Sequence, residues 1–468
     1  MTAVPHRITS AGCARCCPQA ATPMSSNPVV TSCNSISPTP QRPASWTSSD
    51  VPVNRLTAVD AQMFWMSSRM PNDTFLLYGF DGVPVDLPGA LVELAANAGT
   101  SPDLSQRIDD SARLHYPAWI PAPVDEFRFV VHDLDQPTWL GCLAAVGELV
   151  DAQLDAQLAP WRLHVFPGVE GIPGVTGAGT VAVLQITHAL GGGGRTCGPA
   201  ALMFGRQGAV APVVPVYGHP AMLPWRSIEA ARAHRQLVAD TEAGRVPPAA
   251  TPRRPLRTND RPTGVRSMRT VVRDRAQLAG ATVTVCALAG ISEALAGQLR
   301  ELGTDPATLG AEVTMAKSGP RQAYNHFGTV GVGLHPSLPV TQRRAAIAAE
   351  LAARRERAAH PAMRASERAF AATPAPLLRW GIGRFNPDAR SATVTGNTVV
   401  SSVNCGAADF SFGGMPVRLA AAFPGLSPMV GLTHCVTGVG DTISISVFGA
   451  ESAIGDVDGY VERLEAAL

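Results

Sequence analysis

The residues of this chain that are best suited to chemistry lie in the stretch LQITHALGGGGRTCG, from Leu184 to Gly198. It begins inside an apolar run, Thr180–Thr187, that predicts a strand buried on both faces. His188 ends this strand, and four consecutive glycines follow it before a helical apolar pattern, Ala200–Phe204. A strand that ends in histidine and breaks on glycine presents an imidazole at a sheet edge, where the backbone can approach a ligand closely.

Two other interpretations of the same stretch are open. Glycines between a strand and a helix are typical of a phosphate cradle. The GxGxxG pattern fails here because Thr196 stands in place of the last glycine, and the P-loop pattern fails because Arg195 replaces its lysine. The second interpretation is structural: a single histidine beside an apolar strand is often a core residue with satisfied hydrogen bonds.

The segment THALGGG resembles HHxxxDG, the signature of the wax ester synthase/diacylglycerol acyltransferase family. Residue by residue, Thr187 stands where the family has its first histidine, and His188 where it has the second, catalytic one. Gly192 replaces the aspartate and Gly193 matches the final glycine. The resemblance therefore implies that His188 is catalytic and that Thr187, Gly191, Gly192 and Gly193 lie next to substrate.

Three further segments carry the same resemblance. The opening Arg55–Asp60, RLTAVD, resembles the family's PLSPxD, and Thr57 or Asp60 is also a good helix N-cap. The segment Arg321–His326 supplies Asn325 and a second imidazole, His326, and the segment Val403–Gly406 resembles NVPGP with Asn404 displaced by one position. The resemblance covers about residues 55–468 and adds Asn325 and Asn404 to the expected substrate-binding residues.

Length and composition indicate a globular protein with more than one core. A chain of 468 residues exceeds the size that one core normally supports, so two domains are expected. Apolar residues make up 46% of the chain and charged residues 16%. A net charge of +1 gives no electrostatic basis for nucleic-acid binding.

The nine cysteines do not suggest a disulfide framework or a zinc site. Four of them precede residue 34, and the other five are scattered singly: Cys142, Cys197, Cys286, Cys405 and Cys435. Cys13 and Cys16 form a CxxC pair without a matching second pair. Single cysteines are typical of a reducing compartment, so we expect a cytoplasmic protein without a bound metal.

The domain organisation can be read from composition. Residues 1–50 are rich in Ser, Thr, Pro and Ala, carry no signal-peptide core and are expected to be a disordered tail. Residues 51–243 are expected to form an N-terminal lobe with the histidine motif, and residues 267–468 a C-terminal lobe. The segment 244–266 between them is dense in Pro and Arg and predicts a solvated linker, although its arginines offer charge to coenzyme A phosphates or an anionic membrane. No apolar run is long enough for a membrane span.

Periodicity predicts alternating strands and helices, and therefore an α/β fold. Strands are predicted over Phe75–Phe80, Phe127–Val131, Thr180–Thr187, Thr282–Cys286, Gly328–Leu334, Thr393–Val403 and Thr442–Phe448. Helices are predicted after Asp86, over Leu140–Leu154, Ser227–Glu242 and Thr341–Ala359, and at the C-terminus.

The family resemblance makes these expectations specific. It implies two chloramphenicol acetyltransferase-like lobes, each a mixed sheet with helices, and an active-site tunnel at their interface. It implies an acyl-CoA-dependent O-acyltransferase of wax ester or triacylglycerol synthesis, in which His188 is the general base. The partners would be acyl-CoA and a long-chain alcohol or diacylglycerol, with possible peripheral contact with a membrane or lipid droplet. Acyl-CoA is a substrate here, and no cofactor is expected.

Gly192 leaves the activity itself open. In the resembled enzymes the aspartate at this position holds the catalytic loop through an arginine, and glycine adds conformational freedom instead. A slow enzyme, a non-catalytic acyl-lipid-binding paralogue and a condensation-type acyltransferase of lipid assembly are therefore all consistent with the sequence. Another group that braces the loop would favour the enzyme.

Overall fold

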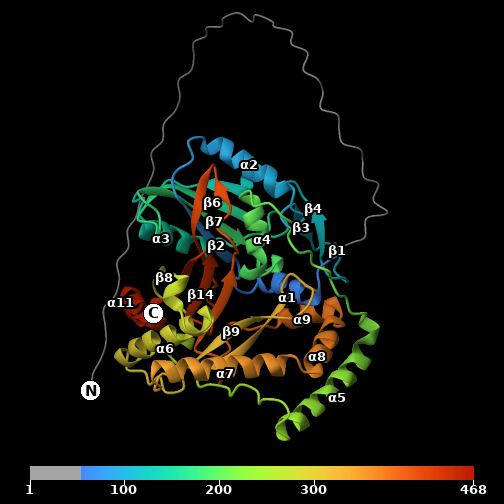
Figure 1. Ribbon diagram of the computed structural model, residues 1–468. Coiled ribbons are helices and arrows are strands. Elements are labelled where there is room, and N and C mark those ends of the chain that lie inside the picture. The colour runs from blue at the N-terminus through green and yellow to red at the C-terminus, as the bar shows by residue number, and fades with distance from the viewer. Residues whose placement is uncertain (1–53) are drawn as a thin grey trace, which may run out of the picture. The chain divides into compact units, whose positions relative to one another are not determined.

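Two six-stranded mixed sheets form the framework of residues 54–468, the part of the chain that this computed structural model describes (Figure 1). The predicted tail, residues 1–50, lies outside the described residues. The first sheet has the order β12-β13-β2-β7-β6-β5. Its strands are β2 (Thr74–Phe80), β5 (Phe129–Val131), β6 (Trp161–Glu170), β7 (Ala178–Ile186), β12 (Ser411–Phe412) and β13 (Met415–Phe423).

The second sheet has the order β10-β9-β11-β14-β15-β8. Its strands are β8 (Arg266–Asp274), β9 (Gly310–Ala316), β10 (Phe327–Gly333), β11 (Thr398–Asn404), β14 (Leu432–Val439) and β15 (Thr442–Ala450). A small sheet joins β1 (Asn54–Arg55), β4 (Ala118–Pro121) and β3 (Gln106–Asp109). The mixed α/β fold predicted from the sequence is thus confirmed.

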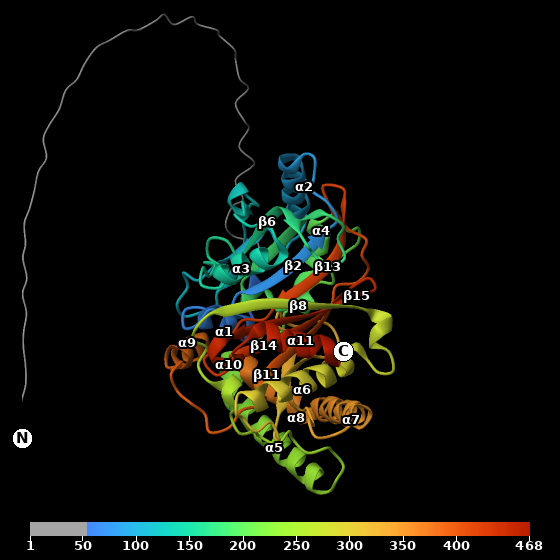
Figure 2. The same cartoon turned by 90° about the vertical axis from the view of Figure 1, so that its left-hand side faces the viewer.

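The two sheets do not divide at one point of the chain. Strand β13 pairs antiparallel with β2, with Ala421 opposite Leu77, although its residues fall in the predicted C-terminal lobe. Strand β8 lies between helices α3 (Trp139–Leu149) and α11 (Val457–Ala467) (Figure 2). Hydrophobic periodicity predicts that a segment is a strand, but it does not specify which sheet the strand joins.

Helices cover the sheets and begin at identifiable caps. The remaining helices are α1 (Ala58–Met66), α2 (Leu87–Gly99), α4 (Gly193–Met203), α5 (Leu223–Glu242), α6 (Val283–Glu301), α7 (Val340–Ala358), α8 (Pro361–Ala371), α9 (Ala375–Gly383) and α10 (Glu451–Ile454). The Thr57 side chain caps α1 and the Asp86 side chain caps α2, each by accepting from a backbone N–H in the first turn. Of the two N-cap candidates for α1, Thr57 is thus the cap, and α2 begins directly after Asp86 as predicted.

One predicted strand is wrong. Thr282–Cys286 is the start of helix α6, where the Thr282 hydroxyl accepts a hydrogen bond from the backbone N–H of Val285. Buried residues occur around nearly the whole circumference of α6. A helix that is apolar on all sides lacks the amphipathic period, so its first turn resembles a buried strand in sequence.

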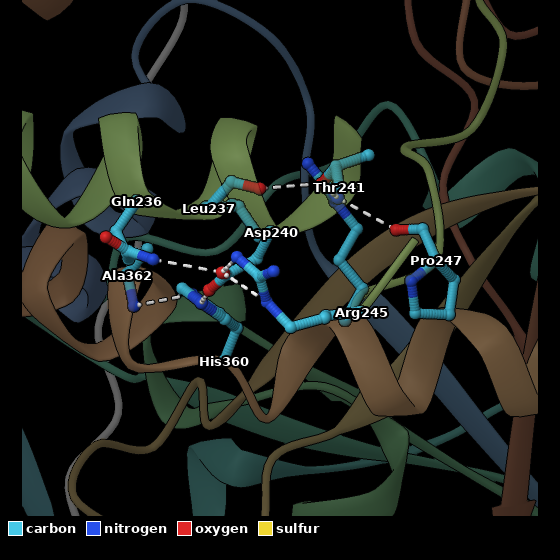
Figure 3. A network of polar contacts seen from close by, with 9 residues as sticks. Gln236, Leu237, Asp240, Thr241, Arg245, Pro247, His360 and Ala362 are labelled. Carbon is cyan, nitrogen blue, oxygen red and sulfur yellow. Dashed lines mark hydrogen bonds and ion pairs between the residues drawn. The ribbon is translucent and has the colours of Figure 1, made fainter. Parts of the chain in front are cut away.

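Helix α5 lies beside α8, and a polar network fixes its C-terminal end (Figure 3). Asp240 accepts hydrogen bonds from Arg245 at 2.6 Å, from Gln236 at 2.9 Å and from His360 Nε2 at 3.1 Å. These donors lower the pKa of Asp240 to about 2, with Arg245 as the largest cause. Arg357 donates in addition to the carbonyl oxygen of Pro247, so the start of the predicted linker is held against α7.

The arginines of the segment 244–266 and of the start of β8 are mostly engaged by protein groups. Arg261 pairs with Asp388, Arg266 with Asp151, and Arg269 with Asp458. Arg253 donates to the carbonyl oxygen of Thr308. Three arginines of this basic strip, Arg261, Arg266 and Arg269, are therefore neutralised by aspartates of the protein itself. Within residues 54–468 no helix has both the length and the apolar character needed to cross a bilayer.

Candidate active site

His188 lies where the sequence predicted it, between a buried strand and a glycine-rich helix start. Strand β7 ends at Ile186, and His188–Leu190 form a single 3-10 turn. Gly191 ends this turn with a positive φ of 100°, and Gly192 is the N-cap of α4. The half-buried imidazole is thus carried on a short turn whose two ends are fixed by β7 and α4.

The side chain of Asn325 holds the His188 ring. Asn325 Oδ1 lies 2.9 Å from His188 Nδ1, and Asn325 Nδ2 lies 2.9 Å from both Asp60 Oδ1 and the His188 carbonyl oxygen. Because both partners of Nδ2 are pure acceptors, this atom must be the amide nitrogen, and Oδ1 must accept from His188. His188 therefore carries its proton on Nδ1, and its Nε2 keeps a lone pair.

Asp60 forms the far end of this chain of hydrogen bonds. Its carboxylate accepts from the Thr57 hydroxyl at 2.8 Å, from Asn325 N at 2.8 Å and Nδ2 at 2.9 Å, and from Tyr324 N at 3.1 Å. Only 1% of Asp60 is exposed, and this burial raises its pKa, while the hydrogen bonds act in the opposite direction. All four of these hydrogen bonds are donated to the Asp60 carboxylate. This pattern matches the ionised form, because an ionised carboxylate only accepts hydrogen bonds.

The surroundings of His188 favour the neutral imidazole. Burial lowers its pKa below the ordinary value of 6.5, because the imidazolium loses solvation, and the hydrogen bond to Asn325 opposes this shift. No group among residues 54–468 is hydrogen-bonded to Nε2. The arrangement supplies an oriented, neutral base with a free nitrogen, which is what proton abstraction from a hydroxyl requires.

A close backbone approach explains the glycine at position 191. A Cβ added there would lie 2.7 Å from the Tyr324 carbonyl oxygen, and the positive φ disfavours any other residue. This close contact between Gly191 and Tyr324 fixes the position of the His188 turn relative to the Tyr324–Asn325 segment. Gly192 differs from Gly191, because its φ is −81° and an added Cβ would meet only Phe327 and His188 at 3.8 and 3.9 Å.

The first turn of α4 is braced by Arg195. This arginine is 6% exposed, forms an ion pair with Asp103 and lies over the Tyr324 ring at 5.7 Å. The Tyr324 hydroxyl donates to Asp103 Oδ1 at 3.0 Å and accepts from Gln106 at 2.9 Å. The start of α4 has no aspartate at position 192. It is held instead to the Tyr324–Asn325 segment by the buried Arg195.

A disulfide corrects the expectation that the cysteines are unpaired. Cys197 in α4 is bonded to Cys405, which directly follows β11, and their Cα atoms lie 5.2 Å apart. The two residues are separated by 208 positions, and pairing over such a distance leaves no local spacing signal in a sequence. Cys142, Cys286 and Cys435 are free and buried. Because disulfides are rare in reducing compartments, the cysteines no longer support a cytoplasmic location.

Three other residues singled out from the sequence, Thr187, Asn404 and His326, form no hydrogen bond with the His188 imidazole. Thr187 is buried, and its backbone N–H donates to the Pro160 carbonyl oxygen. Asn404 is exposed, and its side chain accepts from the backbone N–H of Gly406 in its own turn. The His326 ring is hydrogen-bonded to the backbone N–H of Gln322 at 3.5 Å and not to His188. Asn325 is thus the predicted residue whose side chain is hydrogen-bonded to the His188 ring.

Cavities and metal ligands complete the description. One cavity of about 460 Å³ lies between β8, β15 and the start of α11, and one of about 300 Å³ lies along α4. His188 lines neither of them, and the tunnel expected at the site stays a prediction. No cluster of His, Cys, Asp or Glu that could hold a metal ion occurs within residues 54–468.

Two acidic residues of the site were not predicted from the sequence. Asp60 was identified as part of the RLTAVD opening and as a possible helix N-cap but not as a site residue, and Asp103 was not identified at all. The retained aspartate of the RLTAVD opening was a usable signal for Asp60, since a buried acid in a first helical turn needs donors. The sequence around Asp103 contains no comparable signal.

Known proteins share the fold and part of the sequence. Residues 324–468, which begin with Tyr324 and Asn325, match the family profile described as WS/DGAT C-terminal domain. No curated protein has significant sequence similarity to the chain. The wax ester synthase/diacylglycerol acyltransferase from Marinobacter aquaeolei VT8 superposes with a TM-score of 0.55 at 18% identity, over 88% of this chain and 98% of that one.

Condensation domains share the same fold. A mutant of the starter condensation domain of rhizomide synthetase RzmA, in complex with C8-CoA, gives a TM-score of 0.53 at 13% identity, over 89% of this chain and 93% of that one. The condensation domain from Monacolin K polyketide synthase MokA gives 0.50 at 13% identity, over 89% and 96%. The predicted resemblance is therefore confirmed: residues 324–468 match the WS/DGAT C-terminal domain profile, and the chain has the fold of wax ester synthase/diacylglycerol acyltransferase and condensation domains.

Proposed function

We propose that this protein is an acyl-CoA-dependent O-acyltransferase whose general base is His188. The observation that carries the proposal is the hydrogen-bonded chain from Asp60 through Asn325 to His188 Nδ1, which leaves Nε2 as the free, unprotonated nitrogen. The WS/DGAT family match and the shared fold support acyl transfer as the reaction class. A long-chain alcohol or diacylglycerol is the proposed acceptor, and the product is a wax ester or a triacylglycerol.

The proposed reaction needs one proton acceptor and no covalent enzyme intermediate. His188 Nε2 takes the proton of the acceptor hydroxyl while the hydroxyl oxygen attacks the thioester carbonyl carbon. When the tetrahedral intermediate collapses, the carbon–sulfur bond breaks and Nε2 returns the proton to the departing CoA sulfur. The ester and free CoA are released, and His188 is neutral again.

Asn325 and Asp60 stabilise the charged state of this cycle. When Nε2 is protonated, the imidazolium is adjacent to the Asn325 carbonyl dipole, and the Asp60 carboxylate lies one amide further away. Both favour the positive charge that develops on the ring. Their position is fixed before the reaction, because Asp60 is 1% and Asn325 2% exposed.

Gly192 stands where the resembled family has an aspartate. This difference argues against activity only if it makes the turn that carries His188 more flexible. Three contacts brace this turn without an aspartate: the close approach of Gly191 to Tyr324, the Arg195–Asp103 ion pair and the Cys197–Cys405 disulfide. They support an enzyme over the non-catalytic acyl-lipid-binding paralogue.

The test is ester formation by purified protein from labelled acyl-CoA and a long-chain alcohol or diacylglycerol. Ester that accumulates with the wild type and not with His188→Ala supports the proposal. Binding of acyl-CoA without turnover in the wild type assigns the protein to the non-catalytic class.

A condensation-type reaction is the second candidate, because condensation domains share the fold. In that case the acyl donor is a thioester on a carrier protein rather than on free CoA. Parallel assays with the same acyl group on CoA and on a carrier protein separate the two: a much larger kcat/KM with the carrier protein favours the condensation-type reaction.

We further propose peripheral contact with a lipid surface, since the acceptor is insoluble in water. Helix α9 packs against α1, which carries Asp60, and exposes Leu377 and Trp380. Apolar and aromatic side chains of this kind insert into the interfacial region of a bilayer. Vesicle co-sedimentation that is the same for the wild type and for Trp380→Ser would contradict a role of α9.

A further inference from the structure

The cavity of about 300 Å³ along α4 has a positively charged lining. Its lining includes the arginines Arg195, Arg206 and Arg321, together with small residues such as Gly194 and Gly198, and it contains no acidic residue. Gly194 and Arg195 belong to the first turn of α4, directly after the glycines that follow His188. The cavity is therefore next to the catalytic turn along the chain, although His188 does not line it.

Two of the three arginines are already compensated by protein carboxylates. Arg195 pairs with Asp103, and Arg206 Nε lies 2.6 Å from Asp409. Arg206 also donates to the carbonyl oxygens of Cys405 and Ala407. Neither arginine needs a further anion for charge balance.

Arg321 is the exception. Within residues 54–468 no carboxylate forms an ion pair with this half-buried guanidinium. Burial and the neighbouring charge of Arg195 both lower the pKa of Arg321. The cavity thus holds one positive charge that no carboxylate among the described residues compensates. Three arginines of the basic strip differ from Arg321, since Arg261, Arg266 and Arg269 each have an aspartate partner.

We propose that this cavity binds the phosphate groups of the acyl-CoA donor and that Arg321 is their main ligand. The inference rests on the proposed function and specifies where its donor is held. Guanidinium groups bind phosphate oxygens through two parallel hydrogen bonds, and the amino-terminal end of α4 adds a favourable dipole. The pantetheine arm separates the phosphates from the thioester, so a phosphate site beyond the first turn of α4 leaves the thioester free to extend toward His188.

The experiment measures equilibrium binding, and so it does not depend on turnover. Octanoyl-CoA and octanoyl-N-acetylcysteamine, which lacks all phosphates, are titrated into the wild type, Arg321→Gln, Arg321→Lys and the control Arg235→Gln. Arg235 is exposed on α5 and lies outside the cavity. We expect Arg321→Gln to weaken octanoyl-CoA binding roughly 10- to 100-fold, the effect of losing a hydrogen bond to a charged group.

Further results are expected from the same series. Arg321→Lys keeps the charge and should lose less affinity than Arg321→Gln, while Arg235→Gln should bind as the wild type does. The N-acetylcysteamine thioester should bind all four proteins equally, and inorganic diphosphate should displace octanoyl-CoA from the wild type. Circular dichroism melting of each variant shows whether the fold is intact.

Several results would overturn the inference. One is an Arg321→Gln protein that is folded and binds octanoyl-CoA as tightly as the wild type. Another is weaker binding of that variant to vesicles containing phosphatidic acid without any change for octanoyl-CoA, because the cavity would then hold a lipid headgroup. Arg321-dependent binding in a protein that makes no ester would support the inference and reject the proposed function.

Discussion

Asn325 accepts a hydrogen bond from His188 Nδ1 over 2.9 Å, although 137 residues separate them in the chain. The same amide donates to Asp60 and to the His188 carbonyl oxygen, so neither its orientation nor the tautomer of the ring is ambiguous. One side chain thus links the helix start at Asp60, the turn that carries His188 and the start of the segment that matches the WS/DGAT C-terminal domain profile.

Replacing Asn325 with leucine should slow catalysis while leaving donor binding intact. The leucine removes the acceptor that holds the proton on Nδ1, so the ring is free to adopt the wrong tautomer. We expect kcat to fall about 10- to 100-fold, as for other outer partners that orient a functional histidine. Steady-state kinetics with separate kcat and KM values check this, and Asn386→Ala, which alters only an exposed turn, serves as control. A change in KM alone would contradict the positioning role.

The pH dependence of kcat/KM should report the lowered pKa of His188. A general base must be unprotonated, and burial keeps this imidazole neutral to a lower pH than its ordinary 6.5. We therefore expect an acid limb whose midpoint lies below pH 6.5, with a fall of roughly tenfold per pH unit below the pKa of His188. An acid limb with its midpoint above 6.5 would contradict the expected direction of the shift.

Gly191→Ala should destabilise the fold, since the position has a φ of 100° and lies against the Tyr324 carbonyl oxygen. Left-handed strain in a non-glycine residue costs about 1–3 kcal/mol, and the steric clash adds to it. Urea unfolding measures the difference in free energy. Gly99→Ala is the comparison, because a Cβ there meets nothing within 4 Å and φ is not positive. Equal stability of Gly191→Ala and the wild type would show that the turn relaxes.

The Cys197–Cys405 disulfide should contribute measurably to stability. It closes a long loop and links α4 to the end of β11, so its loss enlarges the unfolded ensemble at a cost of about 2–4 kcal/mol. We expect Cys197→Ser to melt at a lower temperature and to be insensitive to reductant, whereas reductant lowers the melting temperature of the wild type. Mass spectrometry of unreduced peptides checks the bond directly, and two free thiols in protein purified without reductant would contradict it.

Local patterns predicted the part of the site that is contiguous in sequence. The apolar run before His188 and the glycines after it determine strand, turn and helix start, and these are local properties. The family resemblance also indicated Asn325 as a site residue. Its contact with His188 could not be derived from local patterns, because it depends on how the segment before β10 packs on α1.

Long-range pairings account for what was missed. Asp60 contacts Asn325 across 265 positions, and β13 joins β2 in the first sheet although most of the chain lies between them. Thr282–Cys286 was assigned wrongly because complete burial of α6 removes the periodic pattern that identifies a helix. Pairing of Cys197 with Cys405 likewise leaves no trace in their spacing.

The central claim is that His188 Nε2 removes the proton from the acceptor hydroxyl. Its most direct test is the single-turnover rate of ester formation with saturating acyl-CoA, compared between the wild type, His188→Ala and His326→Ala. We predict a loss of about 10²- to 10⁴-fold for His188→Ala, the usual contribution of a general base, and the wild-type rate for His326→Ala. A His188→Ala protein that forms ester at the wild-type rate would contradict the account.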